Sequence, residues 1–309
     1  MRQAPSPSRG SSFRRVAVLL PVLLLLLAIL GANRLVPQSE DITELVNQAR
    51  AMPPVSGTVH LDLAYRGLFR PGARLDLYQP LTSFETGEAP LVVFFHGGSW
   101  IRGDKVTIRI IDRFLRRMRL AGYFVASVNY RSNVLGGFAA PVNNATRSVL
   151  WLRERAELYG YDPDNIGLYG ISAGGHVALM TEADLRDSGA ISFILSECSP
   201  VDLVAMAEGD AFESSPALNM LPESYLRRHS PIEYVSGDMP PVLIYHGDAD
   251  RIVHVRQAYE LFDAIRDAGG RAELEIYEDG THAFLGMPDS LWYEQESRAL
   301  IFMAENFLN

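Results

Sequence analysis

Residues 165–174 read NIGLYGISAG, and this stretch decides the fold. An apolar run that ends in Gly170-Ile171-Ser172-Ala173-Gly174 and continues into a helix-forming segment predicts a buried strand, a tight turn and a helix. A serine hydroxyl is a weak nucleophile unless it is exposed and held beside a base, and a sharp strand-to-helix turn provides the exposure and the orientation. The pattern indicates Ser172 as a nucleophile; the alternative is an ordinary serine that caps the helix.

Strands alternate with helices on both sides of this stretch. We expect strands near 61–65, 74–80, 90–98, 123–130, 165–172, 191–199, 240–250 and 272–279. We expect helices near 105–121, 141–159, 173–186, 254–268 and 290–307. The first two strands alternate apolar with polar residues and predict an antiparallel pair, whereas the later ones are continuous apolar runs, typical of strands buried on both faces. The fold class is therefore α/β, with a mostly parallel eight-stranded sheet flanked by helices.

The segment that follows the apolar run PLVVFF (90–95) predicts a site for a developing negative charge. It reads His96-Gly97-Gly98-Ser99-Trp100, and consecutive glycines let backbone N–H groups approach an oxyanion closely. We assign the donors to Gly97 and Gly98, with Ala173 as the third. His96 is interpreted as a structural residue of this loop. Trp100 is predicted to line the substrate pocket, with plain core packing as the alternative.

Two further loops supply a candidate acid and a candidate base. Asp248 and Asp250 both follow the apolar run PPVLIY (240–245) with which the strand expected at 240–250 begins, and Asp250 lies further past that run, where it can face a base. His282 follows the last strand and can reach both Asp250 and Ser172. Because open parallel sheets place their sites at the carboxyl ends of strands, these loops are expected to meet. The order serine, aspartate, histidine is the order of an α/β-hydrolase triad.

These motifs carry a family resemblance over about residues 58–309. The chain resembles α/β-hydrolases of the esterase and lipase group, closest to their feruloyl-esterase-like and kynurenine-formamidase-like branches. The stretches that carry it are HGGSWIRGDK (96–105), LYGYDPDNIGLYGISAGGHVAL (158–179), HSPIEYV (229–235), HGDADRIV (246–253) and GTHAF (280–284). The resemblance implies the same triad and the same three oxyanion donors.

The motifs together predict a serine carboxylesterase that acts on small or medium esters through an acyl-enzyme. The alternatives are an amidase, formamidase or peptidase of the same fold, or a non-catalytic relative that only binds. This chemistry requires no metal and no organic cofactor. The chain carries 28 basic and 37 acidic residues, and this acidic balance argues against nucleic acid as a partner. A single cysteine, Cys198, excludes an internal disulfide.

The first 34 residues differ in kind from the rest. They hold five arginines and no acidic residue, so residues 35–309 carry a net charge of −14 against −9 for the whole chain. The uncharged run from Val16 to Ala32 follows Arg14-Arg15, the layout of an export signal. We expect a hydrophobic helix in 1–36 that acts as an uncleaved signal-anchor, with the rest of the chain on the extracytoplasmic side of the membrane. The alternative is a signal peptide that is cleaved to release a secreted or periplasmic protein.

Three smaller predictions concern the segments around the catalytic domain, which we place at 58–309. Residues 37–57 are interpreted as a linker that contains a helix ending before Pro53-Pro54. Residues 201–238 break the alternation of strands and helices and are predicted to form a lid that shapes the substrate pocket. In the final helix, Tyr293, Ser297, Leu300, Ile301, Ala304 and Leu308 share one face.

Overall fold

A single eight-stranded sheet runs through the protein. The computed structural model describes residues 38–67, 72–130, 137–209 and 218–307. The strands are β1 (Val59–Ala64), β2 (Arg74–Tyr78), β3 (Ala89–Phe95), β4 (Phe124–Val128), β5 (Tyr161–Ile171), β6 (Ile191–Glu197), β7 (Val242–Gly247) and β8 (Ala272–Tyr277). Their order is β1-β2-β4-β3-β5-β6-β7-β8. The pairs β1–β2 and β2–β4 are antiparallel and the other neighbours are parallel, so the predicted fold class is confirmed.

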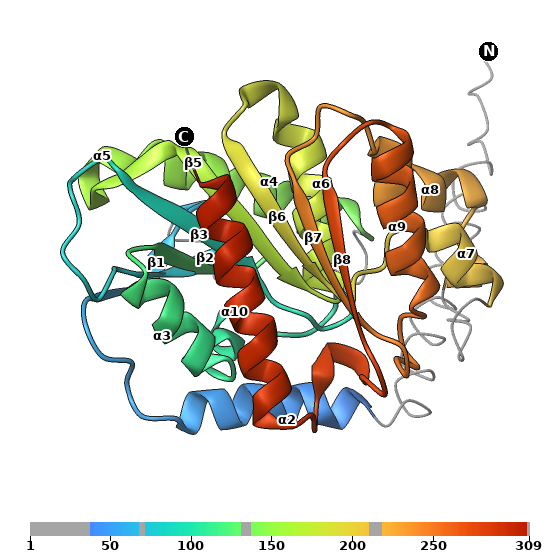
Figure 1. The fold of residues 1–309 in the computed structure, drawn as a ribbon, viewed down its shortest axis with the longest axis horizontal. Helices are drawn as coiled ribbons and strands as arrows, with labels where there is room; N and C mark the ends of the chain where they lie inside the picture. The colour runs from blue at the N-terminus through green and yellow to red at the C-terminus, as the bar shows by residue number, and fades with distance from the viewer. Residues whose placement is uncertain (1–37, 68–71, 131–136, 210–217, 308–309) are drawn as a thin grey trace, which may run out of the picture.

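Helices cover both faces of this sheet (Figure 1). The larger ones are α2 (Gln38–Ala51), α3 (Asp112–Leu120), α4 (Ala139–Arg153), α6 (Ala173–Leu185), α9 (Arg256–Asp267) and α10 (Asp289–Asn306). The short ones near the site are the 3-10 helices η1 (Lys105–Arg109) and η5 (His282–Phe284). Side chains of α4, α6 and α9 join one buried apolar cluster, and side chains of α3 and α10 join the other. The sheet is thus sandwiched between two helical layers, as continuous apolar strands require.

The face of α10 singled out in the sequence analysis is not the face that is buried. Tyr293 and Ile301 are more than half exposed, whereas Ala299, Phe302 and Met303 are buried. Glu296 is also buried, and the physical reason lies in its partners: its carboxylate accepts hydrogen bonds from Arg113 and Arg117 of α3. Paired charges can turn a polar face of a helix inward, and apolar periodicity alone does not reveal this.

Helix α2 lies across the end of the sheet where the parallel strands finish (Figure 1). The predicted helix of the 37–57 segment is therefore confirmed, and it packs against η1 instead of standing apart as a bare linker. Among the described residues, no helix combines the length and the apolar character that a membrane span needs. The predicted hydrophobic helix of 1–36 lies entirely outside the described residues, and it stays a prediction.

Candidate active site

Ser172 stands in the turn between β5 and α6. Its backbone has φ 57° and ψ −124°, a conformation that is costly for a residue with a side chain and is typical of strained functional turns. A Cβ atom at Gly170 would overlap the carbonyl oxygen of Gly174, and one at Gly174 would overlap the carbonyl oxygen of Phe95. The two glycines are therefore what allows strand, turn and helix to pack this closely around Ser172.

A chain of hydrogen bonds joins Ser172 to His282 and Asp250. His282 Nε2 lies 2.9 Å from Ser172 Oγ, and His282 Nδ1 lies 2.7 Å from Asp250 Oδ2. Asp250 Oδ1 accepts hydrogen bonds from the amides of Ile252 (2.8 Å) and Val253 (3.0 Å). Because Nδ1 must donate to the carboxylate, Nε2 is left to accept from the serine hydroxyl, which is the arrangement that activates a serine.

The geometry distinguishes between the two aspartates of this loop. Asp248 is exposed, whereas Asp250 is 2% exposed and contacts the imidazole of His282. Burial alone would raise the pKa of Asp250, but hydrogen bonds from His246 and His282 outweigh burial and hold that pKa below its ordinary value. Asp250 therefore remains a carboxylate throughout the neutral range and can orient and stabilise a charged histidine.

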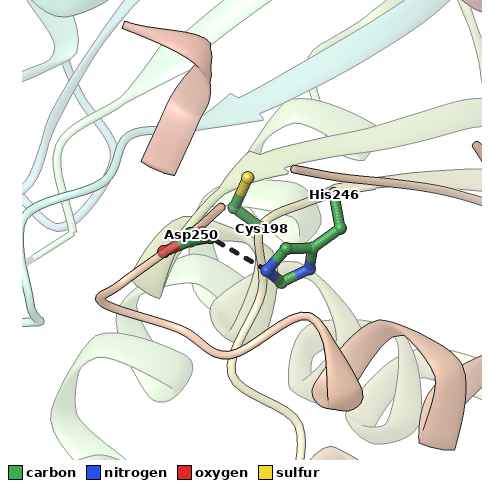
Figure 2. Close-up of side chains that lie close together, drawn as sticks. All are labelled: Cys198, His246 and Asp250. Atoms are coloured by element: carbon green, nitrogen blue, oxygen red, sulfur yellow. Dashed lines mark ion pairs between the residues drawn. The ribbon is translucent and has the colours of Figure 1, made fainter. Parts of the chain in front are cut away.

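Cys198, His246 and Asp250 lie together at the end of this chain of hydrogen bonds that Asp250 forms (Figure 2). His246 Nε2 lies 2.8 Å from the carbonyl oxygen of Val253, to which it donates, and 3.3 Å from Asp250 Oδ2. Burial raises the pKa of the Cys198 thiol well above its ordinary value, so this sulfur is a poor thiolate ligand. The thiol is thus protonated, and His246 Nε2 and the Asp250 carboxylate already have hydrogen-bond partners, whereas the buried His246 Nδ1 has none among the described residues. We interpret the group as support for Asp250 and not as a metal site.

The glycine loop lies directly against the serine turn. Gly97 and Gly98 line the same pocket as Ser172, and an added Cβ at Gly97 would lie 3.5 Å from the Ser172 Cβ. His96 fixes the loop as predicted: its Nδ1 donates to the carbonyl oxygen of Gly97 over 2.7 Å, and its ring stacks on Tyr130. Ala173, the third assigned residue, is the first residue of α6, where an N–H has no partner inside the helix.

A pocket of about 780 Å³ opens over these residues. Its walls come from α2, η1, the segment leading into α3, the loops after β7 and β8, and the first turns of α10. Most of the side chains that form the walls are apolar: Leu45, Phe94, Ile110, Ile111, Ile171, Ala249, Ile252, Ala283, Leu285 and Trp292. Ser172 and His282 both line it, so the reactive atoms face a mostly apolar space large enough for a small organic molecule.

Trp100 does not line this pocket, which differs from its predicted role. Its indole nitrogen donates to Nδ1 of the buried His176 over 3.1 Å, and its ring packs edge-on against Phe138. Burial lowers the pKa of His176 to about 4, so its Nδ1 is an available acceptor. The backbone of Trp100 has a positive φ of 59°, and its side chain contacts this cluster. Core packing, the alternative reading, is what the structure shows.

The predicted lid also lies elsewhere. In the described parts of 201–238, the short helices α7 (Leu203–Glu208) and α8 (Glu223–Arg228) pack around Phe138 and Trp100, and none of their residues lines the pocket. Residues 210–217 lie outside the described residues. Side chains of α2 and α10 occupy the wall that the lid was expected to form. The periodic apolar residues of 42–49 predicted the helix α2 but not its place in the pocket wall. No local sequence pattern indicated that Trp292 lines the pocket.

The fold and the site together define an α/β-hydrolase. A family model described as BD-FAE matches residues 75–265, and the chain belongs to this family. The match covers the strands from β2 to β7, together with Gly97, Ser172 and Asp250, and it ends before His282.

Relatives with assigned names are esterases at modest identity. A probable isoprenylcysteine alpha-carbonyl methylesterase of Oryza sativa is 28% identical over 246 residues, which cover 72% of this chain and 57% of the rice protein. A probable carboxylic ester hydrolase of Mycobacterium tuberculosis is 27% identical over 248 residues, covering 72% and 56%. An arylesterase of Saccharolobus solfataricus is 28% identical over 277 residues, covering 81% and 86%. The chain spans just over half the length of the plant and mycobacterial relatives.

Solved esterases share the architecture. An esterase of Thermogutta terrifontis with bound propionate superimposes with a TM-score of 0.65 at 26% identity, over 82% of this chain and 96% of that one. Esterase B of Lactobacillus rhamnosis superimposes with a TM-score of 0.73 at 20% identity, over 90% and 96%. The second likeness supports the fold alone.

Proposed function

We propose that this protein is a serine carboxylesterase that hydrolyses small or medium esters. The observation that carries the proposal is the pair of hydrogen bonds, 2.9 Å from Ser172 Oγ to His282 Nε2 and 2.7 Å from His282 Nδ1 to Asp250 Oδ2, at the base of an apolar pocket. The names of the relatives, which are all esterases, support the same reaction class.

Acylation starts at the serine oxygen. Ser172 Oγ attacks the ester carbonyl carbon while His282 Nε2 accepts the hydroxyl proton, and a tetrahedral oxyanion forms. The C–O bond to the alcohol then breaks, and His282 gives its proton to the departing alkoxide. Asp250 stabilises the histidine while it is charged.

Deacylation repeats these steps with water. His282 removes a proton from a water molecule, whose oxygen attacks the acyl-enzyme carbonyl. Collapse of the second tetrahedral intermediate returns the proton to Ser172 Oγ and releases the carboxylic acid. Each cycle consumes one ester and one water and yields one alcohol and one carboxylic acid. Ser172 and His282 carry out every proton transfer.

The N–H groups of Gly97, Gly98 and Ala173 are our proposed donors to the oxyanion. Within the described residues, none of the three donates a backbone hydrogen bond to a carbonyl, so each is available to a ligand. Preorganised donors of this kind contribute several kcal/mol to the stabilisation of the transition state, because their dipoles need no rearrangement during reaction.

The size of the ester follows from the pocket. A cavity of about 780 Å³ with largely apolar walls suits a small or medium apolar group on the substrate. The charged side chains on the wall include Glu296, whose carboxylate is already bonded to Arg113 and Arg117. The apolar surface is therefore the main source of binding energy.

Hydrolysis of chromogenic esters tests the proposal. The full chain is assayed with p-nitrophenyl acetate and butyrate and with the corresponding p-nitroanilides, beside Ser172→Ala. The matched control is Ser188→Ala, because Ser188 is an exposed serine beyond the far end of α6. We expect ester hydrolysis that Ser172→Ala abolishes and Ser188→Ala retains. Faster hydrolysis of the anilides would favour the amidase alternative. Equal background rates for wild type and Ser172→Ala with both esters and anilides would refute the proposal that the protein is a serine hydrolase.

For the location of the protein, we propose the uncleaved signal-anchor of residues 1–36, with the catalytic domain on the extracytoplasmic side. The support is the arrangement of Arg14-Arg15 before an uncharged run of 17 residues. N-terminal sequencing of the mature protein tests it. A start near residue 33 would show that the segment is a cleaved signal peptide.

A further inference from the structure

Helix α2 forms part of the wall of the pocket that contains Ser172. Its Leu45 lines the pocket together with Ile110 and Ile111 of the η1–α3 segment and Trp292 of α10. Figure 1 shows α2 across the end of the sheet, below the start of α10. Leu45 precedes the serine turn by more than 120 residues in sequence, so this wall belongs to the site only through the packing of α2.

One side of α2 faces the domain and the other faces solvent. Leu45, Val46 and Ala49 are partly or fully buried, and Ala49 has no exposed surface. Asn47 and Gln48 are exposed. Leu45 and Ala49 are four residues apart and share one face of the helix, so the burial of Ala49 against the domain places Leu45 on the same, inward side.

Polar contacts fix the C-terminal end of α2. Arg50 Nη2 donates to Asp104 Oδ2 over 2.9 Å, and Asp104 in turn caps η1 by accepting from the amide of Val106. Arg109 donates to the carbonyl oxygens of Met52 and Pro53, directly after the helix. These contacts link the end of α2 to the same 3-10 helix that leads to Ile110 and Ile111, so the positions of the two apolar walls depend on each other.

We propose that α2 is a cap that sets how long an apolar chain the pocket accepts, with Leu45 as its specificity-determining residue. The inference rests on the proposed esterase function. A single methylene group in an apolar pocket changes the ratio of kcat/KM values by roughly 10–200-fold. Leu45 lines the pocket with a branched apolar side chain, so its replacement by a smaller or larger residue is expected to change the length of the preferred substrate.

Two substrate series test the cap. One varies the acyl chain of p-nitrophenyl esters from two to twelve carbons, and the other varies the alcohol of alkyl acetates from one to eight carbons. We expect Leu45→Ala to raise, and Leu45→Phe to lower, the ratio of kcat/KM for long over short chains by at least fivefold in one series. That series assigns α2 to the acyl or to the alcohol side. The value of kcat/KM for the shortest substrates should change little, because they do not reach Leu45.

The control is Asn47→Ala, on the exposed side of the same helix two residues away. It should keep the wild-type profile in both series, and thermal unfolding should show that all three variants are folded. If the wild type is active and both Leu45 variants keep its dependence of kcat/KM on chain length, the proposed role of α2 is wrong, while the proposed esterase function stands. A wild type that hydrolyses neither series above the rate of Ser172→Ala would overturn the proposed function, and the cap with it.

A further variant tests whether the ion pair at the end of α2 matters for length selection. Arg50→Ala removes the ion pair to Asp104 without changing the identity of residue 45. We expect KM for the long esters to rise severalfold and KM for acetate to stay within twofold. A uniform rise in KM for all chain lengths would contradict a role of α2 in length selection.

Discussion

Lys105 Nζ lies 2.7 Å from Asp76 Oδ1, and both side chains are almost completely buried. Lys105 is the single lysine of the chain and stands at the end of the loop that begins with His96-Gly97-Gly98. Its carbonyl oxygen accepts from Ser127 Oγ of β4, and its ammonium also contacts Asp62 over 3.0 Å. The end of the glycine loop is therefore tied to the antiparallel edge of the sheet, and the position of the proposed oxyanion donors depends on this buried pair.

Lys105→Met should lower both stability and activity. Burial alone would lower the pKa of Lys105, but its hydrogen bonds to Asp76 and Asp62 raise that pKa, so Lys105 is charged at neutral pH. Burial raises the pKa of Asp76, and the ammonium of Lys105 opposes this by stabilising the carboxylate. Removing one partner leaves a buried uncompensated carboxylate, and we expect the free energy of unfolding to fall by about 3–5 kcal/mol. Urea unfolding measures this loss. Asp62→Asn is the control: Asp62 is 71% exposed, and its pair should contribute less than about 1 kcal/mol. Equal losses in the two variants would contradict this reading.

Asp250→Asn should reduce kcat about 10⁴-fold with little effect on folding, because an amide cannot hold the histidine in the required tautomer. Asp248→Asn is the matched change two residues earlier on the same loop, and it should keep wild-type kcat, since Asp248 is exposed. Steady-state kinetics with p-nitrophenyl butyrate compares the two variants. A larger loss in Asp248→Asn would mean that the acid was misassigned.

Glu197→Gln should remove a dependence of stability on pH. Glu197 is buried at the end of β6, where it accepts a hydrogen bond from Tyr169, and burial raises its pKa from 4.5 to about 7. Because the folded protein binds this proton more tightly than the unfolded chain, stability falls as the pH rises from about 4.5 through about 7. We expect Glu197→Gln to be more stable than wild type at pH 8 by up to about 3 kcal/mol, and the difference to shrink at pH 5. Denaturant unfolding of both proteins at the two pH values checks this. An equal difference at pH 5 and pH 8 would refute it.

Trp100→Phe should affect stability but not substrate binding. The variant leaves Nδ1 of the buried His176 without its donor, which costs about 1–3 kcal/mol. KM for p-nitrophenyl butyrate should stay within twofold, because Trp100 lies outside the pocket. Trp292→Ala, which removes a pocket wall, should raise KM instead. A KM that rises as much in Trp100→Phe would restore the sequence-based role of Trp100.

The strands, and the candidate residues that the structure brings together, could be predicted from sequence because their signals are local. A buried parallel strand is a continuous apolar run, and Gly170 and Gly174 are required by contacts within the same turn. The choice of Asp250 over Asp248 also follows from distance past the strand end. Each of these decisions depends on a few neighbouring residues and on the rule that sites form at the carboxyl ends of parallel strands.

The pocket walls could not be predicted in the same way because they come from segments far apart in the chain. Leu45 and Trp292 meet only after α2 and α10 have packed against the sheet. The burial of Glu296 depends on two arginines of α3, more than 170 residues earlier. Trp100 is next to the glycine loop in sequence, but its contacts are with His176 and Phe138, and it does not line the pocket.

Covalent labelling of Ser172 tests the central claim most directly. The full chain is treated with an alkyl p-nitrophenyl phosphonate, which reacts with activated serines, and the modified peptide is identified by mass spectrometry. We predict one adduct, on the peptide containing Ser172, with ester hydrolysis lost in proportion to labelling, and no adduct in His282→Ala. Labelling of a different serine, or full ester hydrolysis by protein whose Ser172 is completely modified, would contradict the account.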